Sequence, residues 1–304
     1  MYFRELVKNR ILIAGANGML GQRSVDFYSN HENIELLALS IESEPVFDSV
    51  EYVTCDITDR EVVKKTIFDF CPDFILNAAA YTDVDKSEKS RDIAWKVNVK
   101  AVESIAEAAR AIDAHIIHIS SDYIFDGGKG PYSENAVPNP LGYYGRTKLA
   151  SENALRISGT IYTILRTNVL YGTSLNSRPD FVKWLVQALN KNEKVNIVTD
   201  QYNNPTFIDD LVQVVSKVVE FGKTGLYHVG GREFLSRYDF ALKIAECFQL
   251  DKSLINPIST IQLEQQARRP LKSGLITLKA ETELGFKAHS IVEALSEMKR
   301  ELVL

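Results

Sequence analysis

Short apolar runs alternate with longer segments of helical periodicity along the first half of this chain. The first run, RILIAGA, leads directly into an amphipathic segment, and the same order then repeats. Strands that alternate with helices imply βαβ crossovers, so the pattern predicts an α/β fold with a doubly wound parallel sheet of the Rossmann type. Such sheets bind ligands at the C-terminal ends of their strands. We expect strands at 10–16, 34–39, 50–56, 73–80, 115–125 and 161–172, and helices at 18–30, 60–71 and 94–112.

The pattern loosens beyond Gly172. Helices are predicted at 180–192, 208–221 and 237–248, and short strands at 194–198 and 225–229. We interpret residues 1–170 as a dinucleotide-binding domain, with a return to its sheet around residues 205–230. Residues 171–204 and 231–304 are interpreted as a smaller α+β substrate-binding lobe.

Charge and hydropathy limit the classes of partner. A chain of 304 residues that is 45% hydrophobic can bury a large core. The net charge of −5 disfavours nucleic acid and anionic membranes, which reward a basic field. No apolar run reaches the length of a membrane span, and residues 1–10 are too charged for the apolar part of a signal peptide. We therefore expect a cytoplasmic protein with no membrane partner.

Cysteine and histidine usage gives no sign of disulfides or of a metal site. Cys55, Cys71 and Cys247 are too few and too widely spaced for a disulfide framework, and we expect all three in the core. The five histidines include no pair at helical ligand spacing, so no metal is predicted.

A glycine-rich turn, AGANGMLG, joins the first strand to the first helix. Dinucleotide binding needs glycines for the tight turn, for close approach of the backbone to the pyrophosphate and for packing of helix on strand. The spacing here is G-x-x-G-x-x-G, which differs from the commonest fingerprint. Its position after a buried strand nevertheless predicts that this turn binds a dinucleotide with backbone N–H groups. The expected contacts are Gly15, Asn17, Gly18, Met19, Leu20 and Gly21.

The residues that would select the coenzyme follow the next strands. A carboxylate at the end of the second strand selects NAD, and a basic residue accommodates NADP. Ser40 stands at that position with Glu42 just beyond, so the choice between NADH and NADPH stays open. Asp56 and Ile57 end the third strand, where the carboxylate could contact the adenine; alternatively, Asp56 and Thr58 cap the next helix. The alanines that follow the fourth strand complete the expected cofactor contacts: Ala78, Ala79 and Ala80.

The segment PLGYYGRTKLASEN places Tyr144 four residues before Lys148, so that both project from one face of a helix. A pair of this kind is expected about once by chance in such a chain, and its context must decide its meaning. Ser121 ends the fifth strand, where a parallel sheet presents ligand contacts. Asn98 lies inside the helix before that strand, and two interpretations remain: a buried, satisfied amide or part of a proton relay.

Six ordered segments of the chain resemble the extended short-chain dehydrogenases/reductases, and among them the sugar-nucleotide reductases typified by dTDP-4-dehydrorhamnose reductase. The segments are AGANGMLG, NAAAYTDVDKSE, ISSDYIFDG, YGRTKLASE, DQYNNPT and ARRPLKSGL. They cover nearly the whole chain in matching order, which makes them more specific than any single motif.

The resemblance implies roles by position. Tyr144 would protonate the substrate carbonyl, and Lys148 would lower the pKa of Tyr144 and bond the nicotinamide ribose. Ser121 would polarise the carbonyl, and Arg269 would lie near the bound nucleotide sugar, although a surface charge is the alternative. Asn168 stands where the family typically has a tryptophan beside the sugar. The remaining expected contacts of the sugar are Thr82, Val84, Asp122 and Tyr123.

The resemblance also implies a reaction: the reduction of a nucleotide-linked 4-keto-6-deoxysugar by NADH or NADPH, as in the conversion of dTDP-4-dehydrorhamnose to dTDP-rhamnose. The dehydratases of the superfamily have an Asp-Glu pair where this chain has Asp122 and Tyr123, which argues against elimination. Two alternatives remain. One is an epimerase or a reductase of another keto-sugar nucleotide, and the other is a dinucleotide-binding regulatory subunit similar to that of methionine adenosyltransferase. A homodimer is compatible with each of these functions.

Overall fold

The computed structural model describes residues 8–302. Residues 1–7, which belong to the segment considered for a signal peptide, and residues 303–304 lie outside this range. Within it, no helix has the length and apolar character needed to cross a membrane.

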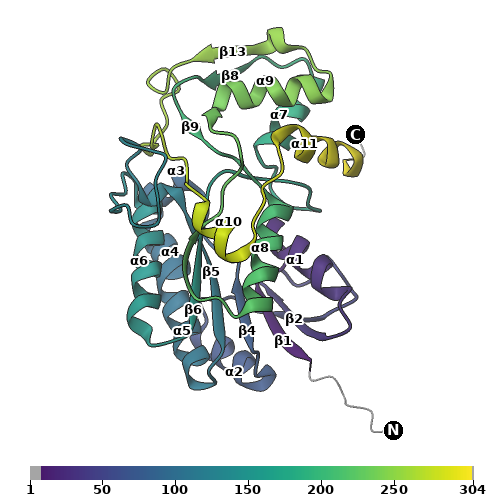
Figure 1. Ribbon diagram of the computed structural model, residues 1–304, viewed down its shortest axis with the longest axis vertical. Coiled ribbons are helices and arrows are strands. Elements are labelled where there is room, and N and C mark those ends of the chain that lie inside the picture. The colour runs from purple at the N-terminus through teal and green to yellow at the C-terminus, as the bar shows by residue number, and fades with distance from the viewer. Residues whose placement is uncertain (1–7, 303–304) are drawn as a thin grey trace.

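A seven-stranded parallel sheet forms the centre of the molecule (Figure 1). The strand order is β11-β6-β5-β4-β1-β2-β3, and every neighbouring pair is parallel. The order reverses between β1 and β4, which is the switch point at which doubly wound sheets bind ligands. The predicted doubly wound sheet is therefore confirmed. Its strands are β1 (Asn9–Ala14), β2 (Ile34–Ser40), β3 (Glu51–Thr54), β4 (Phe74–Asn77), β5 (His115–Ser121), β6 (Tyr162–Thr167) and β11 (Gly225–His228).

Helices cover both faces of this sheet, because alternate residues of each strand point to opposite sides. Ile11 and Ile13 of β1 belong to one hydrophobic cluster, whereas Leu12 and Ala14 belong to another. The first cluster includes helices α1 (Met19–Ser29) and α8 (Ile208–Phe221). The second includes α2 (Arg60–Phe70), α5 (Ala101–Ala111) and α6 (Tyr143–Ser158).

A second group of elements lies beyond the C-terminal edge of the sheet, at the top of Figure 1. Strand β8 pairs there with β13 in parallel, and two short strand pairs, β7 with β10 and β9 with β12, lead toward them. The elements are β7 (Leu170–Tyr171), α7 (Phe181–Asn190), β8 (Val195–Val198), β9 (Tyr202–Asn203), β10 (Thr206–Phe207), β12 (Leu235–Ser236), α9 (Arg237–Phe248), β13 (Ile255–Ile258) and α11 (Ile291–Glu301).

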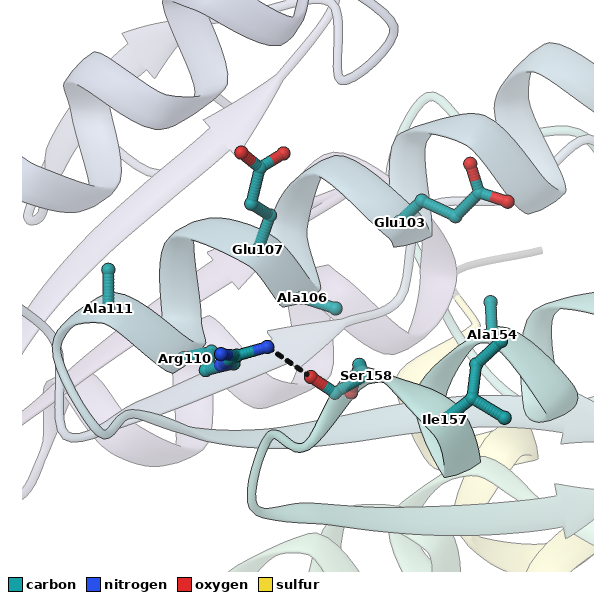
Figure 2. Close-up of a pocket in the computed structure, with 8 residues that line it drawn as sticks. All are labelled: Glu103, Ala106, Glu107, Arg110, Ala111, Ala154, Ile157 and Ser158. Carbon is teal, nitrogen blue, oxygen red and sulfur yellow. Dashed lines mark hydrogen bonds between the residues drawn. The ribbon is translucent and has the colours of Figure 1, made fainter.

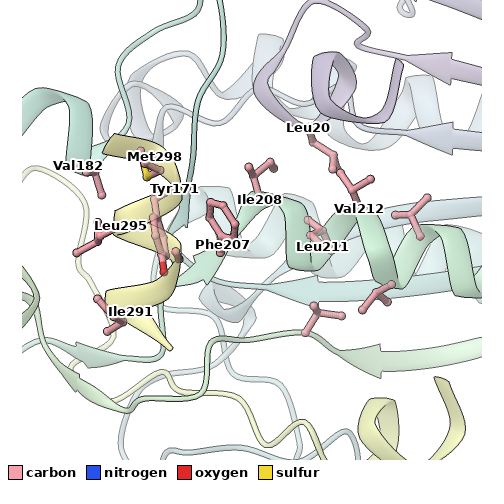
Figure 3. Close-up of a cluster of buried hydrophobic side chains, with 14 of the residues drawn as sticks. Leu20, Tyr171, Val182, Phe207, Ile208, Leu211, Val212, Ile291, Leu295 and Met298 are labelled. Carbon is pink, nitrogen blue, oxygen red and sulfur yellow. The ribbon is translucent and has the colours of Figure 1, made fainter. Parts of the chain in front are cut away.

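One hydrophobic cluster runs through both groups, from Leu20 of α1 through Phe207 and Leu211 to Met298 of α11 (Figure 3). Helix α10 (Leu278–Leu284) also packs against α8 and β11 of the main sheet. The division into a dinucleotide-binding domain and a lobe stays a proposal, since the two groups share this core. Sequence patterns did not predict β13, α10, α11 or α3 (Val84–Lys89).

Two local predictions were wrong. The helix expected at 94–112 is interrupted: α4 (Arg91–Trp95) is followed by a π-helical segment, Lys96–Lys100, before α5 begins. Of the three cysteines expected in the core, Cys55 is buried and Cys247 is partly buried, but Cys71 is exposed. Cys71 ends α2 in a left-handed conformation with φ of 47°, a position at the surface end of the helix.

Candidate active site

The glycine turn after β1 is shaped by close backbone contacts. Gly15 has φ of +82°, and a Cβ there would lie 2.7 Å from the amide nitrogen of Ala79. A Cβ on Gly21 would collide with the carbonyl oxygen of Gly15, which lets α1 start directly against the turn. Gly18 is the exposed N-cap of α1. The turn therefore presents the first N–H groups of the helix, which have no acceptor within the helix.

Side chains within this turn are already engaged with the protein. The Asn17 side chain donates to the carbonyl oxygen of Glu44 at 2.8 Å and accepts from the amide of Val46 at 3.1 Å. Leu20 is buried in the hydrophobic cluster (Figure 3), and Met19 packs against the same cluster. Any contact that Asn17 or Leu20 makes with a dinucleotide would therefore come from the backbone.

The ends of β2 and β3 carry the residues expected near the adenosine. The Ser40 hydroxyl donates to the Glu42 carboxylate at 2.5 Å, which places a carboxylate at the end of β2. Asp56 is exposed and accepts from the amide of Thr58 at 2.9 Å, and Ile57 is buried. The alternative in which Asp56 and Thr58 cap the next helix is wrong, because the N-cap of α2 is Asp59.

The alanines after β4 lie beside the glycine turn. The amide of Ala78 donates to the carbonyl oxygen of Ala14 at 2.9 Å, and Ala79 is the backbone neighbour that leaves no room for a Cβ on Gly15. The segment 78–80 is half-buried, so it forms a wall next to the turn rather than part of the core.

Ser121, Tyr144 and Lys148 come from the end of β5 and the first turns of α6. The Ser121 hydroxyl donates to Asp122 at 3.1 Å and accepts from the amide of Tyr123 at 3.2 Å, in a 3₁₀ turn that follows the strand. The rings of Tyr123 and Tyr144 meet edge to face, with centroids 5.8 Å apart. The strand end and the helix start therefore face one another across this contact.

Burial dominates the titration of these groups. Burial and the nearby Asp122 carboxylate raise the pKa of Tyr144, and the Ser121 hydroxyl only partly opposes them. Lys148 is not among the groups that shift the pKa of Tyr144, so its expected effect on this pKa stays a prediction. Burial lowers the pKa of Lys148 to about 8, although Glu152 opposes the shift. Burial also raises the pKa of Asp122 to about 6.

Asn98 is a satisfied buried amide in the π-helical segment. Its oxygen accepts from the amide of Tyr81 at 2.8 Å. Its nitrogen donates to the carbonyl oxygen of Tyr81 at 3.1 Å and to the Thr147 hydroxyl at 2.9 Å. Asn98 thereby ties the segment after β4 to the helix that carries Tyr144, which agrees with the first of its two interpretations.

The expected sugar contacts fall into two groups. Thr82 is exposed and Val84 begins α3, both on the segment after β4. By contrast, Asn168 is buried, and its amide is bonded to Asn204 at 2.7 Å and to Thr206 at 3.1 Å. Asp122 and Tyr123 thus lie next to Tyr144. The Asn168 side chain is buried and hydrogen-bonded within the protein.

Arg269 forms a bidentate ion pair with Asp85, with distances of 3.0 and 2.7 Å. Its side chain is only 9% exposed, so the alternative of a surface charge is wrong. Burial opposes ionisation of Asp85, but hydrogen bonds from Arg269 and the amide of Ala267 outweigh it and lower the pKa of Asp85. This ion pair connects the segment that carries Arg269, which follows α9 in the chain, to the first turn of α3.

Sequence reasoning missed two residues near Asp122. The Ser273 hydroxyl donates to the second oxygen of Asp122 at 2.5 Å, and Ser273 is buried. Arg237, the first residue of α9, lies close enough to Asp122 and Tyr123 for their charges to act on it. Ser273 lies in the quoted segment ARRPLKSGL and could have been found there, whereas nothing in the sequence around Arg237 distinguishes it from a surface arginine.

Some hollows of the structure lie away from this site. A groove of about 600 Å³ lies between α5 and α6, with Arg110 bonded to the carbonyl oxygen of Ser158 at 3.3 Å (Figure 2). None of its lining residues belongs to the strand ends described above. A second hollow of about 600 Å³ adjoins the Asp85–Arg269 pair and is lined by residues of α3 and of the segment 263–266.

Comparison with known proteins connects this site to a family. Residues 9–304 match the model described as RmlD substrate binding domain. The chain is 33% identical over 302 residues to dTDP-4-dehydrorhamnose reductase of Aggregatibacter actinomycetemcomitans, covering 95% of this chain and 98% of that protein. It is also 33% identical to methionine adenosyltransferase 2 subunit beta of Bos taurus, covering 91% of this chain and 83% of that protein.

A solved structure agrees. The dTDP-4-dehydrorhamnose reductase of Bacillus anthracis in complex with NADP superposes with a TM-score of 0.88 at 30% identity, covering 97% of this chain and all of that one. The doubly wound sheet, the glycine turn and the match over residues 9–304 lead to one conclusion: the chain belongs to the RmlD substrate binding domain family.

Proposed function

We propose that the chain is a reductase that uses NADPH or NADH to reduce a nucleotide-linked 4-keto-6-deoxysugar, with dTDP-4-dehydrorhamnose as substrate and dTDP-rhamnose as product. The observation that carries this proposal is the position of Tyr144 at the C-terminal end of β5, on the same edge of the sheet as the glycine turn: its ring contacts that of Tyr123, and the Ser121 hydroxyl acts on its pKa. The relatives named dTDP-4-dehydrorhamnose reductase support the choice of substrate.

The residues around the turn fit a dinucleotide. The turn has no room for a Cβ at Gly15 or Gly21, and Gly18 leaves the start of α1 open to a phosphate. Ala78, Ala79 and Ala80 would border the coenzyme, and Lys148 would bond its nicotinamide ribose. When bound, the reduced nicotinamide supplies the hydride. The Glu42 carboxylate at the end of β2 favours NADH, whereas the Bacillus anthracis relative was solved with NADP, so both coenzymes enter the test.

The chain's own residues would manage the proton. Because burial and Asp122 raise the pKa of Tyr144, its phenol is protonated at neutral pH and can donate to the carbonyl oxygen of the substrate. The Ser121 hydroxyl would hold the same oxygen and stabilise its developing charge. A Lys148 ammonium with a pKa of about 8 is still mostly charged at pH 7 and would stabilise the phenolate left behind.

The deciding experiment follows the absorbance of NADPH and NADH with dTDP-4-dehydrorhamnose, in the parent protein and in Tyr144→Phe. The substitution removes only the proton donor, so turnover should fall about 10²- to 10⁴-fold while coenzyme affinity is unchanged. Tyr143→Phe is the matched control. Tyr143 is the neighbouring residue, and its ring, 5.1 Å from the Arg91 guanidinium carbon, is kept by the change. Turnover in Tyr144→Phe equal to that in Tyr143→Phe would refute the proposal.

A second candidate function comes from the similarity to methionine adenosyltransferase 2 subunit beta. In this alternative the chain binds a dinucleotide and acts as a subunit of another enzyme. Coenzyme binding without turnover of any keto-sugar nucleotide, together with a stable complex with a methionine adenosyltransferase, would favour it. An epimerase would instead return a keto-sugar nucleotide of changed configuration without net consumption of coenzyme, which analysis of the product detects.

A further inference from the structure

We propose that Arg237, rather than Arg269, binds the diphosphate of the nucleotide-linked substrate. The inference rests on the proposed function for the identity of the substrate, but the anion site itself is argued from the charges of the chain. It reverses the expectation from resemblance, which pointed to Arg269.

Arg269 has little left to offer an anion. Two of its nitrogens bond the two oxygens of Asp85, and one of them also donates to the carbonyl oxygen of Ala267 at 2.8 Å. A guanidinium held in this way is neutralised by its carboxylate and fixed in its orientation. Arg269 therefore acts as a clamp between α3 and the segment that carries Ser273.

Arg237 is placed differently. Its backbone is fixed as the first residue of α9, where its amide donates to the carbonyl oxygen of Gln201 at 2.9 Å. Its guanidinium lies 4.7 Å from the centroid of the Phe181 ring, and the residue is partly buried. Within residues 8–302, however, the guanidinium forms no ion pair and donates no hydrogen bond.

The charged groups around Arg237 do not neutralise the positive charge of its guanidinium. Asp122 is the nearby carboxylate, but its two oxygens already accept from Ser121 and Ser273. Burial lowers the pKa of Arg237; Tyr123 and Asp122 act in the opposite direction, and Arg269 adds a second positive charge. The unpaired donors of Arg237 are not among the buried unpaired atoms of the described residues, so they reach solvent and are available to an anion that enters the site. Arg237, with the charge of Arg269 nearby, is thus placed to bind an anionic ligand.

The position suits a diphosphate. Asp122 and Tyr123 follow Ser121 directly, and the Tyr123 ring contacts that of Tyr144, so Arg237, on which the charges of Asp122 and Tyr123 act, lies near the place where the reacting carbonyl would sit. In a nucleotide sugar the diphosphate is attached to the hexose that carries this carbonyl. The planar fork of arginine can donate to two phosphate oxygens at once, which a lysine cannot do.

The test measures the affinity of dTDP and of thymidine by calorimetry, in protein saturated with NADP⁺. The variants are Arg237→Gln, Arg269→Gln and, as a matched control, Arg232→Gln, an exposed arginine five residues earlier. Loss of charge-assisted hydrogen bonds should weaken dTDP binding about 10- to 100-fold in Arg237→Gln and leave thymidine and NADP⁺ affinities within about twofold. Arg269→Gln should mainly lower the melting temperature, and Arg232→Gln should match the parent protein.

The outcomes separate the inference from the proposed function. Unchanged dTDP affinity in Arg237→Gln, an equal loss for thymidine, or no dTDP binding by the parent protein would overturn the inference. Arg237→Lys, which keeps the charge and loses the fork, should fall between the parent and Arg237→Gln; a Gln variant that unfolds is then replaced by this one. A parent protein that binds dTDP through Arg237 but reduces no keto-sugar would refute the proposed function alone.

Discussion

The two ends of the candidate active site are built on different principles. The cofactor end is one continuous turn, Gly15–Gly21, whose shape comes from backbone contacts with Ala79 and within the turn itself. The substrate end is assembled from side chains far apart in the sequence, such as Asp122 with Ser273 and Asp85 with Arg269. Backbone geometry is encoded locally, whereas pairs of side chains depend on the whole fold. Substitutions at the two ends should therefore fail in different ways.

The largest effect is expected in the glycine turn. Gly21→Ala places a Cβ against the Gly15 carbonyl oxygen, which is backbone and cannot move aside, so the free energy of unfolding should fall by at least about 3 kcal/mol. Gly18→Val is the contrasting variant. Gly18 is exposed with φ of −76°, so that protein should fold with a loss near 1 kcal/mol while coenzyme affinity drops more than about tenfold.

Urea unfolding and coenzyme titration of the two glycine variants check this contrast. A folded Gly18→Val protein with the parent affinity would show that the pyrophosphate does not approach the turn at Gly18. A Gly21→Ala protein as stable as the parent would show that α1 can shift away from the turn.

An intermediate effect is expected at Asn204, where the substrate end is held together. The Asn204 amide bonds Asn168, the carbonyl oxygen of Gly231 at 2.9 Å, and both backbone groups of Leu275. Asn204→Ala leaves these buried groups unpaired, so the free energy of unfolding should fall by about 2–3 kcal/mol. The neighbour Asn203, which is half-buried in β9, gives the control Asn203→Ala. Equal stabilities of the two variants in urea would contradict the role of Asn204.

The smallest effect is expected at the contact between the two groups of elements. His289 bonds Asp210 of α8 at 2.5 Å, and although burial lowers the pKa of His289, the hydrogen bond and charge of Asp210 raise it overall. A pKa above the unfolded value means that the pair stabilises the fold fully below about pH 6.5, and that this stabilisation is lost as pH rises through the folded pKa.

The expected loss is about 0.2–1 kcal/mol, the range of partly exposed ion pairs. It should appear in urea unfolding of the parent protein between pH 6 and 8 and be absent in His289→Asn, with the exposed His31→Asn as control. The same slope in all three proteins would assign the pH dependence to other groups.

Local patterns predicted the elements well and the contacts poorly. The strands at β1, β2, β4 and β5 and the helices α7 to α9 follow from apolar periodicity, because burial on one face repeats along the chain. Periodicity cannot show that Asn98 lies in a π-helical segment, or that Asp59 rather than Asp56 caps α2. Both depend on which backbone groups are left without partners once neighbouring segments have packed.

The site shows the same limit. Tyr144 and Lys148 could be placed on one face of a helix from their spacing, yet the direction of the Tyr144 pKa shift depends on burial and on Asp122, which only the folded chain brings close. Arg269 was identified from a sequence segment, and its partner Asp85 could not be, because the two are 184 residues apart.

The sequence by itself determined the doubly wound sheet and the glycine turn, and it singled out Ser121, Tyr144 and Lys148 as candidate site residues, since each depends on spacing within a short stretch. Only the tertiary structure decided that Arg269 is paired with Asp85, that both oxygens of Asp122 accept hydrogen bonds, and that the Arg237 guanidinium pairs with no carboxylate among residues 8–302. The physical reason is range. Backbone conformation and helical spacing are set by neighbours along the chain, whereas the charge and hydration of a side chain are set by whatever packs around it.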